Sequence, residues 1–417
     1  MIVVKEKKMY DIRKISEDVI YIGCSDRRLS LFESAYPIPS GISYNSFLIN
    51  DEKTVLLDTV DKACSGQFFQ NLEAALDGRE LDYLIVHHME PDHCALIEDV
   101  ISLYPEVKIV TTAKSVALIK QFFDFDIDSC VMVVKDGDTL KTGRHEFVFA
   151  AAPMVHWPEV MVSYDKTDKV LYSADAFGSF GAINGNLFDT GVDFEKDYLD
   201  EARRYYTNIV GKYGAQVQML LKKLGNLEIN TICSLHGMII KDNVAKFIEK
   251  YDLWSKYEPE ETSVLIAYTS VYGGTENAVN ILGGKLADRG VKNIKMYDVS
   301  QTHSSYILSD AFKYSHIVFA TTTYNNGIFE TMENLLHNIT AHNLQNRKIV
   351  LLQNGSWAPT CGSAMKTILE NLKGTEIIDD SVCIKSALKE EQLAELDCLA
   401  DKVVLSLKES EKVLQTV

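Results

Sequence analysis

The stretch His88-Met89-Glu90-Pro91-Asp92-His93 places four side chains that can bind metal ions within six residues. It follows the apolar run Leu84-Ile85-Val86, which predicts a buried strand that ends just before the first histidine. Imidazole and carboxylate groups are ordinary protein ligands of zinc, iron and manganese. The apolar face of a helix or strand does not need this pattern to build a core. The stretch therefore predicts a metal site at the end of a strand.

Three more candidate ligands follow apolar, strand-like runs elsewhere in the first half of the chain: His156, Asp175 and His236. Ligands at strand ends can converge on one edge of a sheet sandwich although they are far apart in sequence. Taken alone, His156 is typical of a hydrogen-bonded loop residue, and Asp175 of a turn or a helix N-cap. Their combination with residues 88–93 favours a metal centre.

The candidate set contains four imidazoles and three carboxylates: His88, Glu90, Asp92, His93, His156, Asp175 and His236. Because a tetrahedral zinc takes about four ligands, this set suits two metals that share a bridging carboxylate. Imidazole combined with hard oxygen donors favours iron or manganese. A related zinc-hydrolase motif, His-x-His-x-Asp-His, has a histidine where Glu90 stands here. This exchange moves the expected metal towards iron and the expected chemistry from hydrolysis towards redox.

The other histidines lack this context. We interpret His87 as an outer contact or a bystander of the metal site. The remaining five are interpreted as surface or loop residues: His145, His303, His316, His337 and His342.

The chain has 417 residues, which suggests about two to three domains. Residues 1–256 contain short strands, including one at 43–49, and a helix at 198–224. A polar hinge at 257–262 carries three glutamates and a proline, and we predict the domain boundary there. Residues 263–417 alternate helices with five short apolar strands, at 264–268, 294–297, 317–321, 349–353 and 381–385. The alternation predicts a doubly wound parallel five-stranded sheet.

Three polar loops follow the first, third and fourth of these strands. Hydroxyls and glycines at a strand-to-helix turn form an anion cradle, and the absence of Gly-Lys-Ser/Thr favours a monophosphate over a nucleoside triphosphate. In a flavodoxin-like sheet these loops lie beside the switch point where FMN binds. A plain helix cap and ordinary loop packing are the alternatives. The candidate FMN-binding residues are Thr269, Ser270, Val271, Tyr272, Gly273, Gly274, Thr275, Thr322, Thr323, Tyr324, Asn325, Asn326, Gly327, Asn354, Gly355, Ser356 and Trp357, with Tyr324 and Trp357 as aromatic flanks of the ring.

The composition of the chain indicates which kinds of partner the protein is not expected to bind. A formal net charge of -17 argues against nucleic acid and anionic membranes, which reward positive charge. We find no signal peptide and no apolar run near the ~20 residues of a membrane helix, so we expect a cytoplasmic protein. The eight cysteines form no Cys-x-x-Cys pair, which argues against a thiolate zinc or rubredoxin-type site and favours free thiols.

Both motif sets together resemble the flavodiiron proteins (A-type flavoproteins), over nearly the whole chain. The resemblance rests on residues 88–93, His156-Trp157-Pro158-Glu159, Asp175-Ala176-Phe177-Gly178, His236-Gly237 and the three loops. It implies an N-terminal metallo-β-lactamase-like αββα domain with a non-haem diiron site, followed by a flavodoxin-like FMN domain. His88, Glu90 and His156 would bind one iron, Asp92, His93 and His236 the other, and Asp175 would bridge them. Tyr205 would be a pocket residue with a catalytic role, whereas Leu31-Phe32-Glu33-Ser34 departs from the family's Phe-His-Gly.

The same resemblance implies an oxidoreductase that passes electrons through FMN to the irons and reduces dioxygen to water, nitric oxide to nitrous oxide, or both. Its electron donor would be a separate protein, such as a rubredoxin, and its assembly a head-to-tail homodimer or a dimer of dimers. The main alternative is a dinuclear zinc hydrolase of the metallo-β-lactamase type with an accessory flavodoxin-like module. A third hypothesis is a pure electron carrier whose first domain has decayed.

Overall fold

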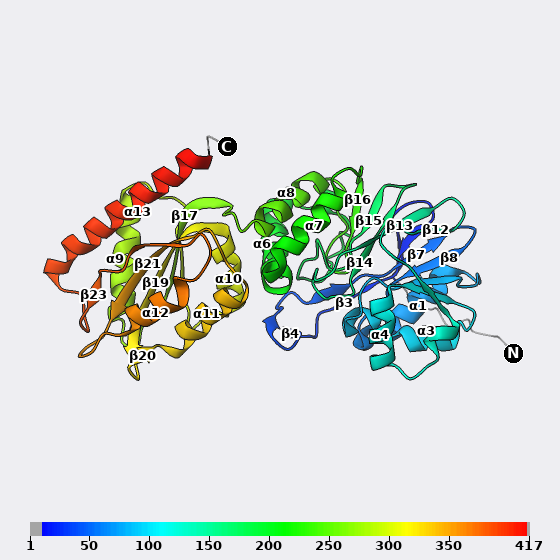
Figure 1. The fold of residues 1–417 in the computed structure, drawn as a ribbon, viewed down its shortest axis with the longest axis horizontal. Coiled ribbons are helices and arrows are strands. Elements are labelled where there is room, and N and C mark those ends of the chain that lie inside the picture. Colours follow the sequence, from blue (N-terminus) through cyan, green and yellow to red (C-terminus); the bar gives the residue numbers. More distant parts are fainter. Residues whose placement is uncertain (1–10, 415–417) are drawn as a thin grey trace, which may run out of the picture. The chain divides into compact units, whose positions relative to one another are not determined.

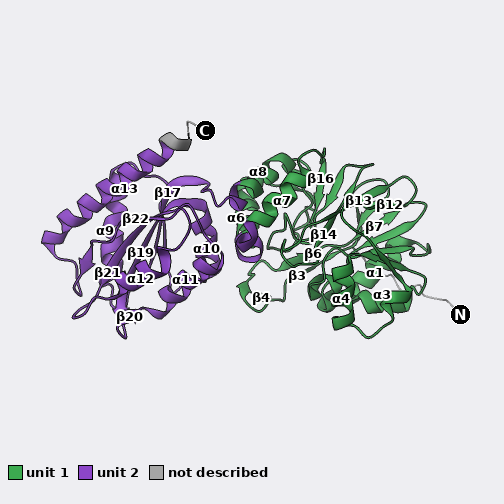
Figure 2. Cartoon of the chain, in the orientation of Figure 1, with its two compact units in different colours: residues 1–206, 215–252 green, residues 207–214, 253–417 purple. Residues whose placement is uncertain are grey.

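The computed structural model describes residues 11–414, with side chains as far as Glu411. The chain divides into two compact units (Figure 2): the first holds the chain up to Tyr206 together with Ala215–Asp252, and the second holds Thr207–Gly214 together with Leu253 onwards. No local sequence pattern indicates the assignment of 207–214 to the second unit. Strand β17 (Glu261–Tyr268) already begins inside the segment that we predicted as a linker. The domain limits 1–256 and 263–417 stay a prediction.

The first unit is an αββα sandwich, as its sequence indicated (Figure 1). One sheet has the order β1 (Arg13–Lys14), β2 (Val19–Tyr21), β7 (Phe47–Asn50), β8 (Thr54–Leu57), β9 (Tyr83–Ile85), β10 (Lys108–Thr111), β11 (Val131–Val133). The other has the order β12 (Thr139–Lys141), β13 (Glu146–Ala151), β14 (Met161–Asp165), β15 (Val170–Tyr172), β16 (Thr231–Cys233). Apolar side chains from both sheets, such as Phe47, Leu57, Phe147 and Tyr172, pack into one core between them.

Short strand pairs and helices complete this unit. The pairs are β3 (Cys24–Asp26) with β6 (Ile42–Tyr44) and β4 (Leu31–Phe32) with β5 (Tyr36–Pro37). The helices are α1 (Ser65–Leu76), α2 (Pro91–Cys94), α3 (Ile97–Leu103), α4 (Ala113–Phe122), α5 (Phe194–Asp197), α6 (Leu199–Tyr205), α7 (Gly214–Leu224) and α8 (Val244–Ser255). None of the helices within residues 11–414 is long and apolar enough to cross a membrane.

The predicted strand at 43–49 is wrong in one respect, because it is two strands. Asn45 and Ser46 separate β6 from β7, and both side chains bond to buried backbone groups. Asn45 Nδ2 donates to the carbonyls of Ser234 and Gly237, each at 2.9 Å, and Ser46 Oγ donates to the carbonyl of Asp58 at 2.9 Å. The chain can therefore change partner strands at this point without leaving these backbone groups unpaired.

The predicted continuous helix at 198–224 is also interrupted. After α6 the chain forms a π-helical turn at Tyr206–Val210 and a 3₁₀ turn at Gly211–Tyr213 before α7 begins. Gly214 explains part of the break, because a Cβ there would lie 2.3 Å from the carbonyl oxygen of Ser255. The spacing of apolar residues along the sequence cannot reveal such a close approach of two backbone segments.

The second unit is a doubly wound parallel sheet with the order β18-β17-β19-β21-β22. In chain order this is 2-1-3-4-5, the flavodoxin-like arrangement. Helices α9 and α13 share a buried core with one face of the sheet, and α10, α11 and α12 lie on the other face (Figure 1). The bounds are β18 (Lys295–Asp298), β19 (Tyr314–Tyr324), β20 (Gly327–Ile328), β21 (Lys348–Asn354), β22 (Glu376–Asp379), β23 (Cys383–Ile384), α9 (Gly274–Asp288), α10 (Ser304–Lys313), α11 (Glu330–Ala341), α12 (Cys361–Leu369) and α13 (Leu393–Leu414).

The fifth strand of this sheet is placed differently from the prediction at 381–385. The edge strand β22 pairs with the start of β21, and the short β23 pairs with its end. The predicted segment therefore covers only β23. An edge strand is buried on fewer sides than a central one, so its apolar signal is weaker.

Candidate active site

The 88–93 stretch leaves the first sheet at the end of β9 and turns directly into the short helix α2. Glu90 is the extended N-cap residue of this helix, and Pro91 occupies its first position, where a missing N–H is tolerated. Asp92 and His93 lie on the first turn and are buried. The strand end and the proline-started turn thus direct four polar side chains into one small volume.

One group of potential metal ligands consists of His88, Glu90, His156 and Asp175, whose donor atoms all lie within 4.8 Å of one another. Glu90 Oε2 is 3.0 Å from His156 Nε2 and 3.3 Å from His88 Nε2. Asp175 Oδ2 is 3.2 Å from His156 Nε2 and 3.3 Å from His88 Nε2. Two imidazoles and two carboxylates therefore surround a common point.

A second group consists of Asp92, His93 and His236, within the same 4.8 Å limit. His93 Nε2 and His236 Nε2 face each other at 3.0 Å, and Asp92 Oδ2 is 3.3 Å from each of them. Asp175 reaches this group with its other oxygen, because Oδ1 is 3.2 Å from His93 Nε2. Asp175 thus presents one carboxylate oxygen to each group, which is the geometry of a bridging ligand.

The residues of both groups fit bound cations. Both carboxylate oxygens of Asp92 and of Asp175 are buried without a hydrogen bond of acceptable geometry among the described residues, although imidazole nitrogens approach them. Buried carboxylates are costly unless they are paired or coordinate a metal. A metal ion at each group would satisfy these oxygens and the facing Nε2 lone pairs together.

Outer contacts orient two of the imidazoles. His88 Nδ1 lies 2.8 Å from Glu159 Oε1, and His236 Nδ1 lies 2.7 Å from the carbonyl oxygen of Ser43. Each Nδ1–H can donate outward, which leaves Nε2 free to accept a metal. Glu159 also accepts the backbone N–H of Met89 at 3.0 Å. Glu159 belongs to the motif His156–Glu159 that carries the resemblance, but its contact with His88 and that of Ser43 with His236 form between distant segments, so neither contact was predicted.

In the first group, ionised carboxylates lie beside imidazoles whose protonated form they stabilise. Burial opposes ionisation of Glu90, but hydrogen bonds from His156 and His88 hold its pKa below the usual value. Burial likewise disfavours charge on His156, yet Asp175 and Glu90 raise its pKa to about 9. Metal binding requires neutral imidazoles, so protons must leave as metals enter.

An aromatic wall and one further carboxyl group lie beside these ligands. The Tyr205 ring is 5.4 Å from the His236 ring and 5.1 Å from that of Phe180, and its buried hydroxyl has no hydrogen-bond partner among the described residues. The structure therefore places Tyr205 at the predicted centre. Glu33, from the segment that departs from the family pattern, contacts Glu90. Burial and the Glu90 carboxylate raise the pKa of Glu33 to about 8.

The interpretation as surface or loop residues was wrong for His316, which lies buried in β19. His145 does lie in the loop between β12 and β13, but its side chain is buried there. His145 is fully buried, with Nδ1 2.7 Å from Asp165 Oδ2 and Nε2 3.0 Å from Asp18 Oδ2. His316 is buried between the hydroxyls of Ser315 and Ser406, at 2.8 and 2.9 Å. Each ring is buried because neighbouring segments supply partners for both nitrogens, which the sequence does not reveal.

In the second unit, a cavity of about 230 Å³ lies among the predicted FMN loops. Eight of the predicted residues line it: Ser270, Val271, Tyr272, Gly274, Thr275, Thr322, Asn354 and Ser356. Ser386 and Ala387 also line it and were not predicted. A Cβ at Gly274 would lie 2.1 Å from the carbonyl oxygen of Ser386, so only glycine fits at this start of α9. Backbone N–H groups at a helix start, with hydroxyls around them, fit a phosphate.

The other predicted residues of these loops do not line this cavity: Thr269, Gly273, Thr323, Tyr324, Asn325, Asn326, Gly327, Gly355 and Trp357. Thr269 is buried, and its hydroxyl is 2.6 Å from that of Thr321. Tyr272 and Trp357 are 99% and 90% exposed, which leaves large aromatic faces beside the cavity for a planar ring. Asn325 and Asn326 form the turn between β19 and β20.

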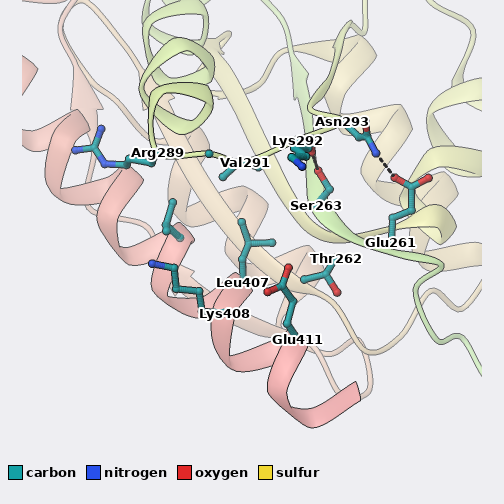
Figure 3. A pocket seen from close by; sticks show the side chains of 12 residues that line it. Glu261, Thr262, Ser263, Arg289, Val291, Lys292, Asn293, Leu407, Lys408 and Glu411 are labelled. Atoms are coloured by element: carbon teal, nitrogen blue, oxygen red, sulfur yellow. Dashed lines mark hydrogen bonds between the residues drawn. The ribbon is translucent and has the colours of Figure 1, made fainter. Parts of the chain in front are cut away.

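A separate cavity of about 520 Å³ lies in the same unit where β17 begins (Figure 3). The predicted FMN loop at residues 269–275, the phosphate loop, follows the other end of that strand. The lining of the cavity mixes the apolar side chains of Val291 and Leu407 with charged ones such as Lys292 and Lys408. Because it touches none of the predicted loops, it plays no part in the flavin site.

Comparisons with known proteins agree with this architecture. Residues 42–237 match the family described as ODP family beta lactamase. An uncharacterized protein of Methanocaldococcus jannaschii is 28% identical over 383 residues, covering 92% of this chain and 95% of its own. The anaerobic nitric oxide reductase flavorubredoxin of Escherichia coli is 28% identical over 362 residues, covering 86% of this chain and 75% of its own.

Solved structures are similar over both units. The rubredoxin oxygen:oxidoreductase of Desulfovibrio gigas has a TM-score of 0.89 at 27% identity, covering 96% of this chain and 99% of its own. A flavoprotein of Thermotoga maritima has a TM-score of 0.86 at 25% identity with the same coverage. The fold and the two ligand groups together are those of a metallo-β-lactamase-like domain that carries a pair of metal-ligand sets and is followed by a flavodoxin-like domain. The chain is similar to flavodiiron proteins over both units, which confirms the resemblance and the fold class predicted from its sequence.

Proposed function

We propose that this protein is a flavodiiron oxidoreductase that takes electrons through FMN and reduces dioxygen, nitric oxide or both. The observation that carries the proposal is Asp175, whose two oxygens face two separate ligand groups, one of which contains Glu90. Relatives named as an oxygen oxidoreductase and a nitric oxide reductase support the reaction class. A zinc hydrolase is not favoured by these relatives, or by a carboxylate at position 90.

In this proposal His88, Glu90 and His156 would hold one iron, Asp92, His93 and His236 would hold the other, and Asp175 would contact both. The loops after β17, β19 and β21 would hold FMN. When bound, the two irons supply redox equivalents and open positions for a diatomic gas, and FMN exchanges electrons singly. The chain's own residues orient these groups and limit the access of water to them.

Individual side chains beside the ligands have distinct parts in the proposal. Phe32 packs edge-on against the His236 ring at 5.4 Å, and together with Phe180 and Tyr205 it makes an apolar wall that excludes water. Tyr205 Oη carries a proton, because burial raises the pKa of this phenol well above its usual value. Glu33 can hold a proton on its carboxyl near neutral pH for the same kind of reason.

The proposal extends to partners and location. The electron donor is a separate protein, such as a rubredoxin, which the name of the similar rubredoxin oxygen:oxidoreductase supports. The active assembly is a head-to-tail homodimer or a dimer of dimers, and the compartment is the cytoplasm. Light scattering on the purified protein tests the assembly, and a strictly monomeric, fully active enzyme would contradict it.

The decisive experiment quantifies iron, zinc and FMN on one anaerobically reduced sample and then measures dioxygen and nitric oxide consumption separately. We expect two irons and one FMN per chain, with rapid consumption of at least one gas. Active protein that contains zinc without iron would overturn the proposal. Protein that contains iron and FMN but consumes neither gas would favour the electron-carrier alternative.

A further inference from the structure

His87 is a buried histidine that directly precedes His88, the first candidate metal ligand. Both of its ring nitrogens have a hydrogen-bond partner. His87 Nδ1 is 2.5 Å from Asp58 Oδ2, and His87 Nε2 is 2.8 Å from Ser163 Oγ. The other oxygen of Asp58, Oδ1, accepts the backbone N–H of His87 at 2.7 Å. His87 and Asp58 are each 1% exposed, and Ser163 is fully buried.

The three residues come from three different strands. Asp58 follows β8, His87 follows β9, and Ser163 is the central residue of β14. β8 and β9 belong to the seven-stranded sheet and β14 to the five-stranded sheet. The His87 ring therefore connects the two layers of the sandwich. The backbone adds another connection, because the N–H of Met161 donates to the carbonyl oxygen of His87 at 3.1 Å.

The order Ser163–His87–Asp58 is that of a hydrolytic triad, but its location excludes that chemistry. A nucleophilic serine must reach a substrate. Ser163 is fully buried and lies in a strand that is paired on both sides, opposite Phe149 and Tyr172. The hydroxyl is thus fixed within the sheet and oriented towards the ring, where it holds the imidazole in place.

Asp58 and its neighbour Thr59 hold opposite ends of the ligand stretch. Asp58 holds the backbone and the ring of His87. Thr59 donates to the carbonyl oxygen of His93 twice, from its backbone N at 2.9 Å and from Oγ1 at 2.6 Å. Asp58 adopts a positive φ of 52°, a conformation that aspartate tolerates better than most residues. Asp58 and Thr59, two consecutive residues, therefore fix the positions of both ends of the segment 87–93.

We propose that Asp58, His87 and Ser163 form a positioning set that presets the 88–93 stretch for metal binding, with His87 acting through His88 and Glu90. This inference rests on the proposed function, because it concerns the affinity of the same metal centre. Contacts that orient metal ligands are typically worth about 10- to 100-fold in metal affinity. The His87 ring contributes through the backbone position of the two ligands that follow it.

The test compares the full-length variants H87Q and S163A with a matched control, H145Q. His145 is also a buried histidine with both nitrogens engaged, by Asp165 and Asp18. It forms a third possible cation group with Asp18 and Asp168, which shares no residue with either proposed ligand group. For each protein, the iron retained against a competing chelator and the electronic spectrum of the iron pair are measured beside the free energy of unfolding. S163A removes a single contact, so it remains informative if H87Q fails to fold.

We expect H87Q and S163A to lose about 10- to 100-fold in iron affinity and to show an altered spectrum, whereas H145Q loses stability but keeps its iron. Equal iron retention in all three variants and wild type would overturn the inference. So would a loss of iron in H145Q that matches the others at equal loss of stability, because a purely structural role then suffices. Wild-type protein that takes up no iron would instead overturn the proposed function.

Discussion

Glu90 Oε2 lies 3.0 Å from His156 Nε2, so a carboxylate completes a ligand group in which a zinc hydrolase of this fold would place an imidazole. The exchange adds a negative charge and a hard oxygen donor to a site that already contains Asp175. Both changes favour iron over zinc. Glu90 thereby links the architecture of a hydrolase fold to redox chemistry.

Replacing Glu90 by histidine should therefore lower iron content and gas consumption together. We expect each to fall at least about tenfold, since the loss of a direct ligand should exceed the lower end of the effect of an outer contact. Metal analysis and gas electrodes on the same sample measure both. The matched control is E98H, at an exposed glutamate on α3. An E90H protein with wild-type iron and turnover would remove the importance we give to this carboxylate.

Replacing Gly274 by alanine should reduce FMN binding. Its Cβ would lie 2.1 Å from the Ser386 carbonyl oxygen and 3.3 Å from Asn354 Nδ2, so the phosphate loop must shift. The flavin-to-protein ratio after gel filtration measures the loss. The control is the same substitution at Gly284, an exposed position of the same helix with no atom within 4 Å of the added Cβ.

G284A should keep its FMN and stabilise α9 by about 0.5–1 kcal/mol, because alanine loses less backbone entropy than glycine on helix formation. A G274A protein that binds FMN as tightly as G284A would show that the loop tolerates the shift. The cavity at this loop would then not be the phosphate site.

The sequence allows the main features of this fold and site to be predicted because they depend on local patterns. Apolar runs followed by polar residues indicate strand ends, and the ends that carry His88, His156 and Asp175 do converge in the structure. Alternating strands and helices likewise predict the parallel sheet of the second unit. Each of these inferences uses residues that are neighbours along the chain.

What could not be predicted depends on contacts between distant segments. The outer partners Glu159 and Ser43 meet their histidines only after the strands have paired. His145 is buried by Asp18 and Asp165, neither of which shares a sequence motif with it. The interruption of the helix after Tyr205 is explained in part by the close packing of Gly214 against Ser255. No periodicity in the sequence contains this information.

His145 should make the free energy of unfolding depend on pH. Burial disfavours its charged form, but Asp165 and Asp18 outweigh burial and raise the pKa of His145 above the ordinary value of 6.5. Arg144 is the neighbouring positive charge that opposes them, with its Nη2 3.4 Å from His145 Nε2. The folded state binds this proton more tightly than the unfolded state does. The contribution of protonated His145 to the free energy of unfolding is therefore complete below about pH 6.5, and it is lost as pH rises through the pKa of the folded state. Denaturant titrations from mildly acidic to alkaline pH measure it.

The variant H145Q isolates this contribution from the other histidines. The difference in unfolding free energy between wild type and H145Q should be largest at acidic pH and shrink towards alkaline pH. A difference that stays constant across the range would mean that the charge on His145 contributes nothing, and that only its packing and neutral hydrogen bonds matter.

Replacing Tyr205 by phenylalanine should separate activity from stability. The Tyr205 hydroxyl is buried with no hydrogen-bond partner among the described residues, so its removal breaks no internal hydrogen bond. Deleting an unsatisfied buried hydroxyl is neutral or stabilising, by up to about 1–3 kcal/mol. Turnover should nevertheless fall, because the burial that raises the pKa of Tyr205 keeps the phenol protonated beside the metal-ligand groups, where it can donate to a bound gas.

The matched control is Y172F, because the Tyr172 hydroxyl is also buried and unpartnered among the described residues, but its ring packs in the core against Phe47 and Phe147. Both variants should be at least as stable as wild type, yet only Y205F should lose turnover, with iron and FMN content unchanged. Since the phenol stays protonated, the loss should be uniform across neutral pH. Equal turnover in the two variants would assign Tyr205 to the apolar wall alone.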